Sequence, residues 1–136
     1  MRRRFAATLS IALATGPLLG LALVAPAQPA RAADEQTSFK DDVLPIFKLY
    51  CVACHHAPDG QGYKASGLDL STYHGVMAGT KYGPMIAPGN ADYSNLMWLL
   101  DWKASPQLRM PHGKKQLPLG ERNIIRSWIN QGAKDN

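Results

Sequence analysis

Both cysteines of the chain lie in one short run, Cys51-Val52-Ala53-Cys54-His55, and a histidine follows directly after the second of them. A Cys-x-x-Cys-His run is the attachment pattern of a c-type haem. The two thiols project from one turn of backbone, so each can form a thioether with one edge of a porphyrin. The following histidine, His55, is then placed to bind the iron. The run therefore predicts one covalent haem, around which the rest of the chain must fold.

Other uses of the cysteine pair fit the sequence less well. A zinc site needs further ligands, but the chain has no third cysteine, and its remaining histidines lack zinc-site spacing. Those histidines are His56, His74 and His112. A thioredoxin-like pair should accompany a βαβ pattern, which is absent. A disulfide between Cys51 and Cys54 would close a very small loop and would stabilise little.

The N-terminal segment, residues 1–32, has the pattern of a secretory signal peptide. Three arginines at positions 2–4 precede an apolar run, and Ala30-Arg31-Ala32 forms an A-x-A cleavage signal. We expect cleavage after Ala32, which leaves residues 33–136 as the mature domain without a permanent membrane span. Retention of the apolar run as a membrane anchor is the alternative. An exported haem protein of this kind is expected in the periplasm.

Removal of the signal peptide changes the charge of the protein. The whole chain has 15 basic and 10 acidic residues, a net charge of +5. Residues 1–32 contain four of the basic residues and no acidic one, so the mature part has 11 against 10 and a net charge of +1. The basic character thus belongs to the signal peptide, and nothing in the mature charge indicates nucleic-acid binding.

Apolar residues at helical spacing predict an all-α domain of about four helices joined by long loops. The first helix begins at Ser38 or near Pro45 and ends at the cysteine run, and residues 56–67 are expected to be a loop. The other expected helices span residues 72–78, a segment between Asn90 or Asp92 and Trp102, and residues 119–131. Loops of this length are uncommon unless they serve a site, and enclosing a haem would explain them.

The iron face opposite His55 requires a second ligand or remains open. Two methionines fall in predicted loops, Met85 and Met110. Met110 is the better candidate, because the following proline favours an extended backbone and because the intervening helices can pass around the ring. Met85 and the nearby His112 remain alternatives.

The sequence resembles the class I c-type cytochromes over essentially all of residues 38–136, and most closely the planctomycete-type cytochrome c domains. The matching runs are Asp42-Val43-Leu44-Pro45-Ile46, Cys51-Val52-Ala53-Cys54-His55, Gly67-Leu68-Asp69-Leu70, Ala87-Pro88-Gly89, Met110-Pro111 and Trp128-Ile129-Asn130-Gln131-Gly132-Ala133. The resemblance implies a class I cytochrome c fold in which the N-terminal and C-terminal helices cross. It also implies thioethers at Cys51 and Cys54, His55 as the proximal iron ligand and Met110 as the distal one.

The sequence departs from the family pattern at two positions. Leu68 stands where a proline is common, and in the family the carbonyl of that proline accepts the second N–H of the proximal histidine. A leucine carbonyl can take the same role. His112 stands where a second proline is frequent after the methionine, which places an imidazole two residues from Met110.

The resemblance implies a single-electron carrier that shuttles between Fe(II) and Fe(III) and exchanges electrons with redox partner proteins. Filled axial positions leave no place for a substrate, so no catalysis is expected. One alternative is a haem c subunit of a periplasmic dehydrogenase or reductase complex. Another is a haem-based gas or redox sensor, in which the distal ligand would be labile and carbon monoxide would bind rapidly.

Overall fold

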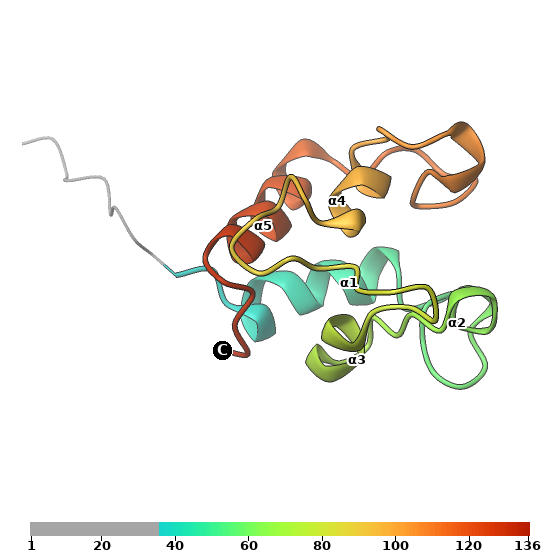
Figure 1. Cartoon of the computed structure of the whole chain (residues 1–136), viewed down its shortest axis with the longest axis horizontal. Helices are drawn as coiled ribbons and strands as arrows, with labels where there is room; N and C mark the ends of the chain where they lie inside the picture. The colour runs from blue at the N-terminus through green and yellow to red at the C-terminus, as the bar shows by residue number, and fades with distance from the viewer. Residues whose placement is uncertain (1–35) are drawn as a thin grey trace, which may run out of the picture. The chain divides into compact units, whose positions relative to one another are not determined.

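The computed structural model describes residues 36–136 (Figure 1). The expected signal peptide, residues 1–32, lies outside the described residues. The described part contains helices and no β-strand: η1 (Phe39–Val43), α1 (Leu44–Tyr50), α2 (Gln61–Ser66), α3 (Tyr73–Ala78), α4 (Asn95–Leu100), η2 (Pro106–Leu108) and α5 (Leu119–Asn130). This confirms the all-α class, with one α-helix more than the four expected.

The first helix changes its winding at Pro45. Ser38 caps the helix, since its hydroxyl accepts a hydrogen bond from the Asp41 N–H at 3.1 Å, as a capping serine does. The reciprocal contact comes from Asp42, whose carboxylate accepts the Ser38 N–H at 2.7 Å. Residues 39–43 form a π-turn, and regular α-helix begins at Leu44, next to the proline. Pro45 has no N–H to donate. No backbone hydrogen bond from residue 45 is therefore lost where the π-turn changes to the α-helix.

The expected loop at residues 56–67 contains the additional helix, α2. Gly60 and Gly62, at its start, are poor helix formers. The carbonyl of Cys54 accepts hydrogen bonds from the N–H groups of Gly62 and Tyr63 at 2.9 and 3.1 Å. The helix therefore begins on the backbone of the cysteine run rather than on a capping side chain. It ends at Gly67, whose φ of 80° is suited to glycine.

Helix α5 packs against η1 at the N-terminal end of the first helix (Figure 1). Phe39 and Trp128 lie with ring centroids 5.3 Å apart at the centre of this contact. The last residue also binds the start of η1, because the Asn136 side chain accepts the Phe39 N–H at 2.9 Å and its backbone carbonyl accepts the Lys40 N–H at 2.9 Å. The contact between the N-terminal and C-terminal helices agrees with the class I resemblance.

A group of ion pairs joins the end of α4 to α5. Asp101, which follows α4, has only 8% of its side chain exposed. One of its carboxylate oxygens lies 2.6 Å from Arg122, and the other contacts Arg126. Arg126 also pairs with Asp92 at 2.8 Å. These ion pairs hold the start of the loop that follows Asp101 against α5.

Removal of the charge on Asp101 is expected to destabilise the protein strongly. In Asp101→Asn two arginines lose the buried carboxylate that faces both of them, which should lower the free energy of unfolding by about 3 kcal/mol. Thermal unfolding of the haem-bearing protein measures the effect. Asp59→Asn is the control, because Asp59 is exposed and lies 3.9 Å from Lys64, and it should change stability by less than about 0.5 kcal/mol. Equal effects of the two substitutions would contradict this account.

Within residues 36–136, no helix has the length and apolar character needed to cross a membrane.

Candidate functional site

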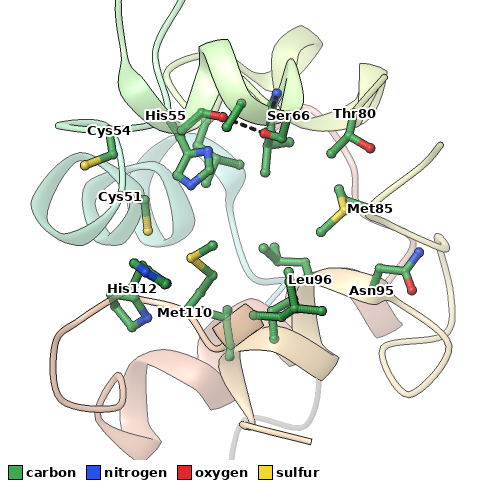
Figure 2. Close-up of a pocket in the computed structure, with 18 of the residues that line it drawn as sticks. Cys51, Cys54, His55, Ser66, Thr80, Met85, Asn95, Leu96, Met110 and His112 are labelled. Atoms are coloured by element: carbon green, nitrogen blue, oxygen red, sulfur yellow. Dashed lines mark hydrogen bonds between the residues drawn. The ribbon is translucent and has the colours of Figure 1, made fainter. Parts of the chain in front are cut away.

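A cavity of about 740 Å³ lies between the cysteine run, α2, α4 and the loop after α4. Most side chains that line it are apolar, and its volume is within the roughly 300–1,000 Å³ typical of small-molecule and cofactor sites. Figure 2 shows His55 and Met110 pointing into this cavity from opposite walls. Cys51 and Cys54 lie along one side, and Met85, Thr80 and Asn95 lie across from them. The structure therefore brings all four predicted site residues to one cavity.

The cysteine run is held by its own backbone. The N–H of Cys51 continues α1 by donating to the Phe47 carbonyl at 2.9 Å, and the N–H of His55 donates to the Cys51 carbonyl at 2.9 Å. The carbonyl of His55 accepts the N–H of Leu70 at 2.9 Å. The run is thus fixed between α1 and the segment that leads to α3, and this orientation turns the His55 imidazole into the cavity.

Gly62 forms the surface on which the His55 imidazole rests. A β-carbon at position 62 would lie 2.6 Å from Cε1 and 2.7 Å from Nε2 of His55, closer than any side chain is tolerated. Only glycine lets α2 approach the ring this closely. Gly62 was expected only as part of the loop at residues 56–67, and its spacing from the histidine could have indicated a close backbone approach.

Burial lowers the pKa of His55, and the nearby Leu68 carbonyl opposes this effect by raising it. The imidazole is therefore held in the neutral form, which is the form that binds a metal ion. Its buried Nδ1 atom has no well-formed hydrogen bond among the described residues, and the Leu68 carbonyl is its nearby acceptor.

The two thiols differ in their surroundings. Burial raises the pKa of the Cys51 thiol to about 12, the positive charge of Lys114 lowers it, and the neighbouring Cys54 raises it further. Cys51 is therefore a protonated thiol at the edge of the cavity. The Cys54 thiol is exposed and its side chain points outward (Figure 2). Both cysteines nevertheless line the cavity.

Met110 is held by its backbone on both sides. Its N–H donates to the carbonyl of Leu99 in α4 at 3.2 Å, and its carbonyl accepts the indole N–H of Trp102 at 3.0 Å. Its half-buried side chain packs against the core and faces His55 across the cavity (Figure 2). The loop therefore presents the thioether from a fixed position.

The two alternative ligands also line the cavity. Met85 is buried, with 8% of its surface exposed, and it lies on the side away from the cysteines (Figure 2). His112 is exposed at the rim near Met110 and Cys51 (Figure 2). Of the other histidines, His56 forms a 2.7 Å contact between its Nδ1 and the Val52 carbonyl, and His74 is exposed and does not line the cavity.

The residues present fit a covalently attached haem. Cys51 and Cys54 share one edge, a neutral imidazole and a thioether face each other, and the walls are mostly apolar. Residues 36–136 contain no group of three or more histidine, cysteine or acidic residues suited to a metal ion. The thioredoxin alternative requires strands, and the described residues form only an isolated bridge between Thr80 and Gly83.

Comparison with known proteins adds a family to this geometry. Residues 51–112 match the model of a family described as planctomycete cytochrome C. The match begins at the first cysteine and ends two residues after Met110, so it includes all four predicted site residues. The match is consistent with a cytochrome c-like domain. No curated protein and no solved structure matches the chain.

The cytochrome domain implies a covalent haem c and an electron-transfer role, and this agrees with the cavity. Two of the features that shape the site were not predicted from the sequence. These are the contact of Gly62 with the imidazole and the anchoring of Met110 by Trp102. All three indole N–H groups, those of Trp98, Trp102 and Trp128, donate to backbone carbonyls.

Substitution of Gly62 by alanine is expected to displace the His55 imidazole in the cytochrome domain. The added β-carbon overlaps the ring, which should destabilise the protein by about 1–3 kcal/mol and alter the haem spectrum. Gly120→Ala is the matched control, because Gly120 lies in α5 with open space around its α-carbon, and alanine there should stabilise the helix by about 0.5–1 kcal/mol. Thermal unfolding and absorption spectra of both variants test this. A Gly62→Ala protein with an unchanged spectrum and stability would contradict it.

Proposed function

We propose that the protein is an exported single-electron carrier with one haem c. Cys51 and Cys54 would attach the haem, and His55 and Met110 would be its axial ligands. The observation that carries this proposal is the placement of His55 and Met110 on opposite walls of one cavity, with both cysteines along its edge (Figure 2). The haem supplies a one-electron couple between Fe(II) and Fe(III).

The residues of the chain have three tasks in this proposal. The cysteines would hold the haem, and the neutral imidazole of His55, supported by Gly62, would be one ligand of its iron. Met110 would supply a second ligand of the iron, which would leave no open position for a substrate, and the protein is therefore proposed to have no catalytic activity of its own. A thioether ligand and an apolar cavity both favour the ferrous form, so the reduction potential should be higher than that of a bis-histidine haem.

The place of action is part of the proposal. The arginine-rich start, the apolar run and the A-x-A site of residues 1–32 support export to the periplasm with cleavage of the signal peptide. The partners would be larger redox proteins that donate and accept single electrons. A haem c subunit bound permanently to a dehydrogenase or reductase would use the same site, and co-purification with a catalytic chain distinguishes it from a free carrier.

A redox titration of the purified holoprotein, followed by its absorption spectrum, tests the function. We expect one reversible one-electron transition per chain. The reduced protein should return its electron to a chemical oxidant without consuming any added organic substrate. A chain without a reversible one-electron transition would contradict the proposed role.

A further inference from the structure

Trp102 lies directly after α4 and Asp101, at the start of the loop that carries Met110. Its indole N–H donates to the Met110 carbonyl at 3.0 Å, while the Met110 N–H donates to the Leu99 carbonyl at 3.2 Å. Both hydrogen-bonding groups of the Met110 backbone are therefore held by residues in and directly after α4.

The backbone of Trp102 has an unfavourable conformation. Its φ is 58°, in the left-handed region that bulky residues rarely adopt. Such a conformation persists only where the surrounding structure stabilises it. The Arg109 guanidinium lies over the Trp102 ring, 5.3 Å from its centroid, and Arg109 also donates to the Ala104 carbonyl at 3.4 Å. The indole is thus held between the Met110 carbonyl at its N–H and Arg109 at its face.

The other tryptophans show that this arrangement is specific to Trp102. Trp98 donates its indole N–H to the Asp92 carbonyl at 3.2 Å and is 49% exposed. Trp128 donates to the Lys134 carbonyl at 2.9 Å within the core. Neither of these carbonyls belongs to a residue that lines the cavity. Only the Trp102 hydrogen bond ends on the proposed ligand residue.

We infer that Trp102 is a positioning residue that keeps the Met110 thioether on the iron. This inference rests on the proposed function, in which Met110 is the distal ligand. Loss of the indole N–H leaves one side of the Met110 backbone free, so the loop can move the thioether away from the cavity. Trp102 would then determine how often the thioether leaves the iron, and so how readily a small ligand such as carbon monoxide binds there.

Trp102→Phe tests the inference, because it removes the N–H and keeps an aromatic ring under Arg109. The measurement is the rate at which the ferrous holoprotein binds carbon monoxide, together with the methionine–iron band of the ferric form. Loss of one hydrogen bond should raise the fraction of molecules with a dissociated thioether about tenfold. The rate of carbon monoxide binding should increase by the same factor. Trp98→Phe is the matched control and should bind carbon monoxide at the wild-type rate.

Two results would overturn the inference: a wild-type rate in Trp102→Phe, or an equal increase in Trp98→Phe. Met110→Leu, measured in parallel, separates this failure from that of the proposed function. If Met110→Leu also leaves the rate unchanged, Met110 is not the ligand. If Met110→Leu binds rapidly and Trp102→Phe does not, only the role of Trp102 is wrong.

A second variant covers the case in which Trp102→Phe does not accumulate as a folded protein. Arg109→Ala removes the guanidinium from the indole face and keeps the indole N–H. It should increase the carbon monoxide rate about two- to fivefold, in proportion to the loss of one cation–π contact. An unchanged rate in Arg109→Ala would then overturn the inference.

Discussion

Replacement of Met110 by leucine is expected to abolish the methionine–iron band of the ferric holoprotein and to open the sixth iron position. Leucine has a similar volume and no sulfur, so the change removes the ligand without leaving a large gap in the cavity wall. Carbon monoxide should then bind the ferrous form faster by orders of magnitude, because no thioether has to leave first. The reduction potential should fall, since the axial ligand that favours Fe(II) is lost.

Two further variants decide between Met110 and its alternatives. Met85→Leu is the matched substitution at a buried methionine of the same cavity, and His112→Ala removes the imidazole at the rim. Both should retain the band and the slow reaction with carbon monoxide. Loss of the band in Met85→Leu, with Met110→Leu unaffected, would assign the distal ligand to Met85. A wild-type protein without the band, in which only His112→Ala makes carbon monoxide binding rapid, would assign it to His112.

The double substitution of Cys51 and Cys54 by alanine is expected to leave the protein without any covalent haem. Each thiol provides one thioether, so a chain that lacks both cannot retain the haem after denaturation. The cavity of about 740 Å³ would then be an unfilled apolar space, and the protein should be strongly destabilised. Haem staining of a denaturing gel and thermal unfolding measure the two effects.

A control for the double substitution lies between the two cysteines. Ala53 is exposed, and Ala53→Ser leaves both thiols and His55 in place, so this variant should carry a full complement of haem. If the double variant kept the haem through denaturation, the attachment assigned to Cys51 and Cys54 would be wrong.

Local patterns were sufficient to predict the helices whose apolar face is continuous. The last helix was expected at residues 119–131 and spans Leu119–Asn130, because its apolar residues and the glycine after it are local signals. The cap at Ser38 and the change of winding at Pro45 follow from side-chain chemistry and from the missing N–H. Helix α2 could not be predicted in this way, since its first N–H groups bind the Cys54 carbonyl, which lies seven residues before the start of the helical backbone.

The site residues that could be predicted from the sequence are those whose side chains can bind a haem or its iron. Cys51, Cys54 and His55 form a short motif, and Met110 stood out by its loop and by the family resemblance. What holds these residues in place depends on contacts between separate segments. The approach of Gly62 to the imidazole requires α2 to fold back on the cysteine run. The hydrogen bond from the Trp102 indole to the Met110 carbonyl occurs with a left-handed backbone at Trp102. A bulky residue rarely adopts that conformation, so it could not be predicted from the sequence.

The mass of the purified mature protein under denaturing conditions tests the central claim most directly. If Cys51 and Cys54 attach a haem, the denatured chain should have the mass of residues 33–136 plus one haem, and its spectrum should remain that of a haem after extraction with acidified organic solvent. A chain with the mass of the polypeptide alone, from cells that mature other c-type cytochromes, would contradict the account.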